Sequence, residues 1–545
     1  MNKKRVLILI GGQYHPFESC ANLLKGFVEA AGRHRCEISE DRDRLKARSI
    51  NRFDAVILYT QGGELEKTQL EGLLNFVKKG GGCVGIHGAA ASWQKHDAYV
   101  DFLGGTFASH GPIMEFPVTI TSAKSVITQR IQNFRVTDEL YTLDKFDPKT
   151  VEILATASWH GKAHPVAYRR TYGAGRVFYL ALGHDERAFG HAEFQKMAIR
   201  GLDWTLRRPE REPLTSGVIG YGGAFNMGRM HLQGLRDAAG FQTVAVCELD
   251  AARRQVAEQE NPGIKTYPSV SEMLRKSDVE LLVVITPHES HARLALQCLK
   301  AGRHVIMEKP FCLTVKEADA MIEAASKNRR MLSVFHNRRW DGDYMTIKDV
   351  IQRGLLGDVF HIELAGGGYH HPGYWWRSHK PISGGGFYDW GAHFVDWVLG
   401  LVPAKLTEIS GHFQDKRVWH DVTNEDHCNA VLRFGNGCCA NIELSSLAAV
   451  NKRRWRILGT KGGLEDVGDN RFRLVTFRDG VKLDSFVAYQ PGDWQAYYRN
   501  IGDHLTLDEP LAVTPESARR VIGVIETAEK SSRARKAVPA PREWA

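Results

Sequence analysis

The feature that most constrains the fold is a glycine-rich loop directly after a short apolar run. Val218–Ile219 predicts a strand, and Gly220-Tyr221-Gly222-Gly223 follows it at once. Glycine permits a tight turn and lets the backbone approach a pyrophosphate, which then lies on a helix N-terminus. The third glycine of this pattern is replaced by Phe225, and the next one, Gly228, lengthens the loop. We therefore expect a strand–loop–helix unit that opens a dinucleotide-binding Rossmann domain.

An acidic residue stands where such a unit needs one. Glu248 follows the next apolar run, Val244–Cys247, about 20 residues beyond Gly228. A carboxylate at this position accepts hydrogen bonds from ribose hydroxyls and repels a 2′-phosphate. The sequence therefore predicts NAD as the cofactor and disfavours NADP. The alternative is a plain glycine turn beside a surface glutamate.

Strand-sized apolar runs alternate with helical patterns over most of the chain. Before the glycine loop the strands are expected at Val6–Ile10, Ala55–Tyr59, Cys83–Ile86 and Val177–Leu182; after it they are expected at Leu281–Ile285, Val305–Met307 and Leu332–Phe335. This alternation predicts two doubly wound α/β layers with largely parallel sheets. From about residue 360 strands dominate, which predicts an α+β module with a mostly antiparallel open sheet, closed by a helix at Pro515–Ser531.

The clearest break between these parts is Arg207–Thr215, which holds two prolines and a run of charges. Such a segment is typical of an interdomain linker. We predict four segments: an α/β domain at 1–208, a linker at 209–215, the dinucleotide-binding domain at 216–336 and a substrate-binding α+β domain at 337–545.

Composition excludes several classes of protein. Lys and Arg exceed Asp and Glu by 72 − 63 = 9 and are interleaved with them, so we expect no nucleic-acid partner. Nine cysteines without a CxxC pair fit reduced thiols. The longest apolar runs are strand-sized, and the first one meets Gly11 too early for a signal peptide. We expect a cytoplasmic protein without a membrane partner.

Residues 215–545 resemble the Gfo/Idh/MocA family of sugar oxidoreductases, which includes glucose–fructose oxidoreductase and inositol dehydrogenase. Besides the glycine loop with its trailing His231, the resemblance rests on ITPHESHA at Ile285–Ala292, MEKPF at Met307–Phe311 and GGGFYDWGAHFVDW at Gly384–Trp397. It implies hydride transfer between NAD and a sugar hydroxyl. It also implies a homo-oligomer, a dimer or tetramer packed through the open face of the C-terminal sheet.

Three residues are the candidates for catalysis. Lys309 follows a Rossmann strand, so it faces the crevice where ligands bind and can stabilise a developing alkoxide. Asp389 and His393 are spaced i, i+4, which puts carboxylate and imidazole on one helical face. The resemblance makes Lys309 catalytic, His393 the general base and Asp389 the group that orients substrate or histidine. A structural Asp–His pair is the alternative.

The remaining candidates line the expected cofactor and substrate sites. For the cofactor they are Gly220, Gly222, Gly223, Ala224, Phe225, Asn226, Met227, Glu248, Thr286, Pro287, His288, His291, Glu308 and Lys309. For the substrate they are His336, Asn337, Trp376, Arg377 and His393. Aromatic rings beside hydrogen-bonding groups suit sugars, although core aromatics would give the same pattern.

Residues 1–208 resemble the ThuA-like trehalose-utilisation family, a relative of class I glutamine amidotransferases. The resemblance rests on LILIGGQYHPF (Leu7–Phe17), GGGCVGIHGA (Gly80–Ala89), DELY (Asp138–Tyr141) and GAGRVFYLALGHD (Gly173–Asp185). In amidotransferases a cysteine nucleophile follows a strand, and here the matching position is His87. Without that thiol, thioester chemistry on glutamine has no nucleophile, so amidotransferase activity is not expected.

Polar residues at the expected strand ends of this half would gather along one sheet edge. They are His15, His87, His110, Glu139, His184 and Asp185. Such a set fits a zinc-like ion with an open position, acid–base groups for sugar enolisation, or a vestigial site. The sequence does not choose among these three.

The pairing of the two halves suggests the overall activity. ThuA-like proteins act beside a Gfo/Idh/MocA-type dehydrogenase in disaccharide use, where sugars are oxidised to 3-keto derivatives. We therefore expect an NAD-dependent oxidoreductase acting on a secondary hydroxyl of a sugar or glycoside, at C3, with the N-terminal half binding or processing the keto-sugar. The alternatives are redox-neutral glycoside cleavage or epimerisation with recycled NAD, and a carbohydrate-binding or regulatory protein without turnover.

Overall fold

A computed structural model describes residues 3–208 and 211–541 of the chain. The chain forms two compact units, Met1–Arg211 and Glu212–Ala545, which are treated separately below as the first and second unit.

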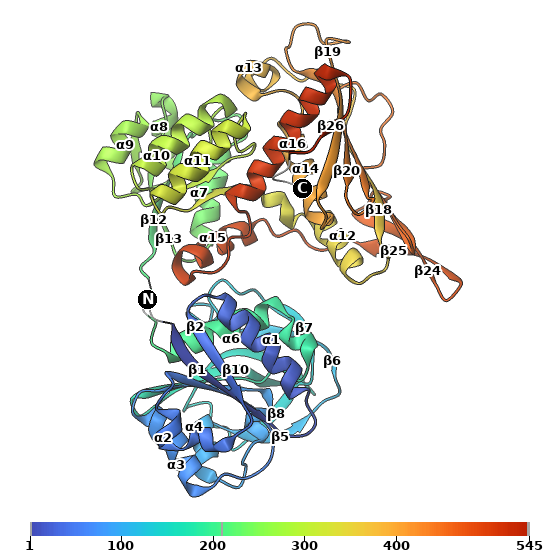
Figure 1. The fold of residues 1–545 in the computed structure, drawn as a ribbon. Helices are drawn as coiled ribbons and strands as arrows, with labels where there is room; N and C mark the ends of the chain where they lie inside the picture. Colours follow the sequence, from blue (N-terminus) through green and yellow to red (C-terminus); the bar gives the residue numbers. More distant parts are fainter. Residues whose placement is uncertain (1–2, 209–210, 542–545) are drawn as a thin grey trace. The chain divides into compact units, whose positions relative to one another are not determined.

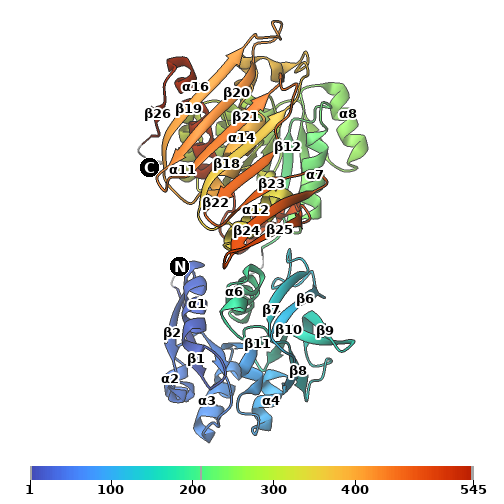
Figure 2. The same ribbon diagram turned by 90° about the vertical axis from the view of Figure 1, so that its right-hand side faces the viewer.

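The first unit is built on a nine-stranded sheet in the order β2-β1-β3-β4-β11-β10-β9-β6-β7. The strands β2 (His34–Ser39), β1 (Lys4–Gly11), β3 (Ala55–Thr60), β4 (Gly82–Ile86) and β11 (Gly175–Leu180) are parallel. Val6–Ile10 of β1 and every residue of β3 and β4 are buried, which is why the sequence shows these central strands as continuous apolar runs. Figure 2 shows β2, β1 and β11 in this sheet.

The other half of this sheet is antiparallel. It consists of β10 (Lys162–Tyr172), β9 (Glu152–Trp159), β6 (Met114–Ile120) and β7 (Phe134–Asp138). Buried and exposed residues alternate along β6, so it carries no continuous apolar run for sequence analysis to find. The helices α1 (Phe17–Ala30), α3 (Lys67–Lys78) and α6 (Ala192–Thr205) each pack a buried apolar stripe onto the unit.

The second unit begins with a six-stranded parallel sheet in the order β14-β13-β12-β15-β16-β17. These strands are β14 (Lys265–Tyr267), β13 (Phe241–Cys247), β12 (Leu214–Ile219), β15 (Leu281–Val284), β16 (His304–Met307) and β17 (Leu332–Val334). The connecting helices are α7 (Met227–Asp237), α8 (Ala251–Glu260), α9 (Val270–Lys276), α10 (His291–Lys300) and α11 (Val315–Lys327). This is the Rossmann arrangement that the glycine loop predicts.

A nine-stranded, mostly antiparallel sheet completes the second unit, in the order β25-β24-β23-β22-β18-β21-β20-β19-β26. Figure 2 shows its central strands side by side: β18 (Val359–Gly367), β19 (Leu406–Asp415), β20 (Glu425–Phe434), β21 (Cys439–Ser445) and β22 (Trp455–Gly459). The remaining ones are β23 (Gly462–Asp466), β24 (Arg471–Arg478), β25 (Val481–Ala488) and β26 (Val538–Pro539). The sequence therefore predicts the fold class of the whole chain correctly.

Two long helices connect this sheet to the Rossmann layer. In Figure 1 α16 (Pro515–Ala534), drawn in red, lies between the Rossmann helices and the sheet, in contact with α11 and β19. The helix α14 (Trp390–Leu401) packs against α16 and β21. One continuous hydrophobic core runs from the Rossmann strands to these helices, so the crevice between the two layers has a rigid frame.

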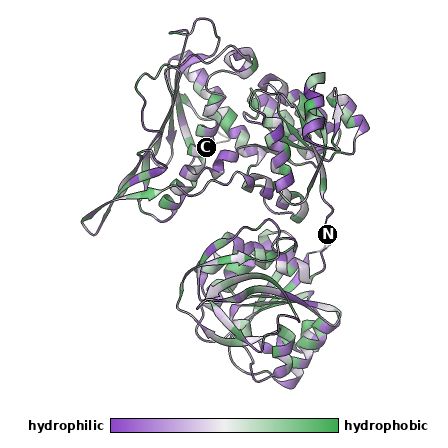
Figure 3. Cartoon of the chain, turned by 180° about the vertical axis from the view of Figure 1, so that it is seen from behind, coloured by the Kyte–Doolittle hydropathy of each residue, from purple (hydrophilic) through white to green (hydrophobic). Residues whose placement is uncertain are grey.

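The helices are amphipathic. In Figure 3 green and purple bands alternate along them, as expected for helices that bury one face and solvate the other. Among the described residues, no helix combines the length and apolar character needed to cross a bilayer.

Candidate active site and a second histidine cluster

A cavity of about 620 Å³ lies at the carboxyl ends of the Rossmann strands in the second unit. Its walls come from the glycine loop, the end of β13, the loop after β15 and the residues that follow β16. Ligands of open α/β sheets bind at this edge, where the strand order reverses. The fold thus places the cavity where the sequence predicts the cofactor.

Gly220, Gly222 and Gly228 meet three different structural requirements of the loop. Gly220 has φ of +103°, and a side chain there would collide with the carbonyl oxygen of Ile285. A Cβ on Gly222 would meet no atom within 4 Å, so the backbone is open to a ligand at this point. A Cβ on Gly228, in the first turn of α7, would lie 2.8 Å from the carbonyl oxygen of Gly220. Gly228 therefore supplies the close helix–strand packing of the missing third glycine.

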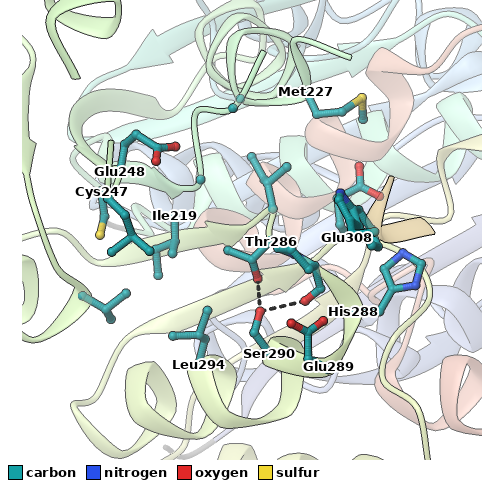
Figure 4. A pocket seen from close by; sticks show the side chains of 18 of the residues that line it. Ile219, Met227, Cys247, Glu248, Thr286, His288, Glu289, Ser290, Leu294 and Glu308 are labelled. Atoms are coloured by element: carbon teal, nitrogen blue, oxygen red, sulfur yellow. Dashed lines mark hydrogen bonds between the residues drawn. The ribbon is translucent and has the colours of Figure 1, made fainter. Parts of the chain in front are cut away.

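The carboxylate of Glu248 is held in place at the cavity wall. Its Oε2 accepts a 2.6 Å hydrogen bond from the backbone N–H of Tyr221, and its Oε1 accepts a 3.0 Å bond from that of Asp250. Figure 4 shows this carboxylate at the edge of the cavity. A fixed negative charge here can accept hydrogen bonds from vicinal ribose hydroxyls and repels a phosphate.

The loop after β15 is braced by short internal contacts. The hydroxyl of Thr286 lies 2.6 Å from that of Ser290, which donates to the carbonyl oxygen of Pro287 (Figure 4). The buried imidazole of His291 lies between two carbonyl oxygens, Pro310 on Nδ1 and Thr286 on Nε2, each at 2.9 Å. His291 therefore ties this loop to the segment that carries the candidate lysine.

A buried chain of polar groups fixes the residue before Lys309. The carboxylate of Glu308 lies 2.9 Å from Nε2 of His231, whose Nδ1 lies 2.6 Å from the hydroxyl of Tyr498. The other carboxylate oxygen accepts the backbone N–H of Lys309 at 2.9 Å. Burial acts to raise the pKa of Glu308, but the contacts with His231 and Lys309 together outweigh it and hold that pKa below its usual value.

Lys309 and Asp389 meet at the inner end of the cavity. The Lys309 ammonium donates a 2.5 Å hydrogen bond to Oδ1 of Asp389, and Arg377 donates to the same oxygen at 2.8 Å. Burial acts to raise the pKa of Asp389, but the two cations overcome it and hold that pKa well below its usual range. The described hydrogen bonds of Asp389 thus go to Lys309 and Arg377 rather than to His393, because Asp389 precedes the first turn of α14, at the N-cap position, and its side chain makes no capping bond to the helix.

The imidazole of His393 lies on the same helix, one turn inside, and only 4% of the residue is exposed. Its ring centroid lies 5.8 Å from that of Trp390 and 5.9 Å from that of His336. Burial, aided by the nearby Lys309 charge, holds the pKa of His393 well below its usual value, so the ring is neutral at pH 7. Asp396 turns away from this site and accepts a bidentate pair of hydrogen bonds from Arg339.

A second cavity of about 640 Å³ adjoins the first on the side of the large sheet. Trp375 and Arg377 line both cavities, while Lys309 lines the first and Asp389 the second. The rings of Phe225, Trp375 and Trp376 surround the Arg377 guanidinium at 4.8–5.4 Å from its carbon. The two cavities therefore meet at the Lys309–Asp389–Arg377 cluster.

Most of the predicted site residues line these cavities. Gly220, Gly222, Ala224, Phe225, Met227, Glu248, Thr286, Pro287, His288, Glu308, Lys309, Trp376 and Arg377 line the first cavity. Gly223, Asn226 and His291 are not among the residues that line it; nor do His336, Asn337 and His393, which are buried, line either cavity.

The second cavity also has lining residues that the sequence analysis did not single out. They include Trp390, Asn424, Glu425, Glu443, Lys452 and Arg454. Glu425, Glu443, Lys452 and Arg454 lie on or next to antiparallel strands, where inward and outward residues alternate. No local motif marks them, and only the register of the sheet brings them together.

The first unit contains a separate cluster at the carboxyl ends of its parallel strands. His15 follows β1, His87 follows β4 and His184 follows β11. One nitrogen from each ring lies within 4.8 Å of the others. Glu139, directly after β7, lies 3.6 Å from His87, 3.2 Å from His184 and 2.8 Å from His110.

The sequence predicts that these polar residues lie together, and the exception is Asp185. Asp185 instead accepts the backbone N–H of Arg187 and caps the short helix that follows. His87 has φ of +42°, which is the strained turn expected at the position of an amidotransferase nucleophile. An imidazole occupies it here.

Comparisons with known proteins agree with this architecture. The family model "Oxidoreductase family, NAD-binding Rossmann fold" matches residues 214–336, and that of the GFO/IDH/MocA C-terminal domain matches 344–465. The model "Trehalose utilisation" (ThuA) matches residues 5–205. An uncharacterised oxidoreductase of Schizosaccharomyces pombe is 30% identical over 266 residues, 47% of this chain and 71% of that protein.

The chain therefore belongs to the Gfo/Idh/MocA oxidoreductase family and carries a ThuA domain before it. Its relatives include scyllo-inositol 2-dehydrogenase (NADP(+)) of Bacillus subtilis, 26% identical over 61% of this chain and 97% of the relative. A solved NAD-binding protein from Listeria innocua is 26% identical, with a TM-score of 0.55 over 60% of this chain and 97% of that one. As a member of this family, the protein is an oxidoreductase that uses a nicotinamide cofactor.

The residues of the first cavity fit such a cofactor. The open backbone at Gly222 and the N-terminus of α7 suit a pyrophosphate, and the fixed carboxylate of Glu248 suits a ribose diol. A bound nicotinamide ring would supply the hydride acceptor. The chain's own contribution is to hold Lys309 in the wall of the same cavity, paired with Asp389 of the second cavity.

The charge of Glu248 should decide between NAD and NADP. We expect Glu248→Gln, which removes the charge but keeps the shape, to tighten binding of NADPH by about tenfold, since like charges close together cost at least about 1.4 kcal/mol. Binding of NADH and NADPH is measured by cofactor fluorescence, with the exposed Glu258→Gln as the matched control. Equal affinity of the native chain for both cofactors would show that Glu248 does not discriminate.

Proposed function

We propose that the second unit oxidises a secondary hydroxyl of a sugar or glycoside with NAD as the hydride acceptor. The observation that carries this proposal is the Lys309–Asp389–Arg377 cluster, which stands where the cofactor cavity meets the second cavity. A substrate in the second cavity would present its hydroxyl to this cluster. The reacting carbon would then face the inner end of the cofactor cavity.

Oxidation of an alcohol removes a hydride from carbon and a proton from oxygen. The ammonium of Lys309, paired with Asp389, favours the oxyanion that develops as the hydride leaves. The neutral imidazole of His393 is the group suited to accept the proton. Asp389 and Arg377 position Lys309 and exclude a mobile counter-ion from the site.

The lining of the second cavity supports a polyhydroxylated substrate. Its lining contains both carboxylates and cations, such as Glu443 paired to Lys452, and Glu425 of the lining pairs with Lys380 behind it. The indole of Trp390 is 38% exposed at its wall, beside the guanidinium of Arg454. Hydroxyl edges and an apolar ring face need these two kinds of surface. The Bacillus subtilis relative, whose name gives scyllo-inositol as its substrate, supports the same class.

We propose C3 as the position oxidised, and the first unit as the part that binds or processes the resulting keto-sugar. The support is the pairing of a ThuA domain with this type of oxidoreductase on one chain. NAD rather than NADP is supported by the carboxylate of Glu248, although the Bacillus subtilis relative is named for NADP.

The test is absorbance at the NADH band of the purified chain with NAD and a panel of mono- and disaccharides. We expect a sugar-dependent rise in NADH, and chromatography with mass spectrometry should find a keto-sugar that sodium borodeuteride labels at C3. Product formation without NADH would instead indicate redox-neutral cleavage or epimerisation with recycled cofactor. Neither NADH nor product with any of the sugars would contradict the proposal.

A further inference from the structure

We propose that His15, His87 and His184 of the first unit bind a divalent transition-metal ion of the zinc class, with Glu139 beside it. This inference concerns a site outside the redox centre and does not depend on the function proposed for the second unit.

The position of the cluster is that of a ligand site. Its three histidines follow β1, β4 and β11, which run parallel in one sheet, so their side chains meet at the carboxyl edge. The chain proceeds from β1 to β2 on one side and to β3 on the other, so His15 stands where the strand order reverses. Open α/β sheets bind their ligands at this point.

Two ring nitrogens of the cluster, Nδ1 of His15 and Nε2 of His87, are buried and make no hydrogen bond among the described residues. The buried Nδ1 of His184 lies 3.2 Å from a carboxylate oxygen of Glu139. A buried polar atom left without a partner costs about 1–3 kcal/mol, so these nitrogens together indicate a site for a further ligand. The residue His87 is completely buried.

The tautomer of His87 is set for metal binding. Its Nδ1 lies 2.7 Å from the carbonyl oxygen of Ala181, which can only accept a hydrogen bond and so places the N–H on Nδ1. The Nε2 lone pair is thereby left facing His15 and His184. A histidine ligand held through its other nitrogen by a backbone carbonyl is the usual arrangement in metal sites.

Glu139 supplies the negative charge. One carboxylate oxygen lies 3.2 Å from His184 and 3.6 Å from His87, while the other lies 2.8 Å from His110. His110 is the more exposed neighbour, with 48% of its side chain accessible. Glu139 can therefore act as a fourth ligand or accept a proton from a water molecule on the ion.

The donor set and the spacing select the class of ion. Imidazole nitrogens with one carboxylate suit zinc and its neighbours rather than calcium or magnesium, which prefer oxygen. The nitrogens lie within 4.8 Å of one another. Tetrahedral zinc with bonds of about 2.0–2.1 Å places its ligands about 3.3 Å apart, so small side-chain rotations close the site.

The experiment uses the full chain, stripped with a chelator, reloaded with zinc chloride and desalted. We expect one zinc per chain by mass spectrometry of the elements, and a rise in melting temperature with added zinc. The double variant His15→Gln/His184→Gln should bind zinc at least about 100-fold more weakly by calorimetry, since two ligands are lost. His160→Asn, which changes an exposed histidine of the same unit, should behave like the native chain.

Cobalt provides a second readout, because a tetrahedral nitrogen site gives it visible absorption bands. These bands should appear with the native chain and be lost in the double variant. If that variant does not fold by circular dichroism, Glu139→Gln is compared instead and should weaken binding while keeping the triad. Zinc retention by the native chain no greater than by the double variant, or equal affinities, would overturn the proposal. These measurements do not depend on NADH formation by the second unit, so they test the metal site separately from the proposed function.

Discussion

Lys309→Ala should lower kcat for sugar oxidation by about 10²–10³-fold while NAD binds almost as before. The expected loss is that of one preorganised donor to a developing oxyanion. Lys309 lies where the two cavities meet and is positioned from both sides, by Asp389 at its ammonium and by Glu308 at its backbone N–H. Its removal takes away charge at the reacting oxygen without touching the glycine loop. Single-turnover NADH formation and NADH fluorescence separate the two effects.

Three variants sharpen this prediction. Lys316→Ala removes an exposed lysine seven positions later and should leave kcat unchanged. Lys309→Arg keeps the charge in another geometry and should recover only part of the rate, because a planar guanidinium does not replace a compact ammonium. Asp389→Asn should lower kcat with Lys309 intact. A Lys309→Ala enzyme that keeps its kcat but has a higher KM would mean that this residue only binds substrate.

The fold could be predicted from the sequence because its central strands are buried on both faces. Val6–Ile10 and Leu281–Ile285 read as continuous apolar runs, and glycine and helical patterns follow them at the right distances. The antiparallel strands β6 and β9 do not give this signal, because exposed or half-buried residues interrupt the buried ones along both strands. Their place in the first sheet is set by pairing with distant strands.

Residues at strand ends could be placed from the sequence, but the hydrogen-bond partners of Asp389 could not. Residues at the ends of parallel strands, such as His15, His87 and Lys309, meet whatever their separation in sequence. The partner of Asp389 was not predictable, because spacing along α14 suggests His393 whereas the loop before the helix turns the carboxylate toward Lys309 and Arg377. Spacing of i, i+4 places two side chains on one face only when both residues lie within the helix, and Asp389 precedes the first turn.

His393→Asn should lower kcat by about 10²–10⁴-fold and change the way the rate depends on pH. The base works in its neutral form. Because burial and Lys309 lower the pKa of His393 in the folded chain, the native enzyme should keep its kcat/KM as the pH falls through the usual imidazole value of 6.5. In the variant the hydroxyl must ionise without a base, so the residual rate should rise steadily with pH.

The lowered pKa of His393 also makes the stability of the chain depend on pH. Below pH 6.5 His393 binds a proton in the unfolded chain but stays neutral in the folded chain. The free energy of unfolding should therefore decrease as the pH decreases below 6.5, and it should decrease less in the variant. His412→Asn, an exposed histidine on β19, is the matched control and should alter neither profile. A native kcat/KM that halves near pH 6.5 would place His393 at its ordinary pKa. A variant with the native profile and rate would mean that His393 does not accept the proton, and would move that role to a group at the junction of the two cavities, where Lys309 stands.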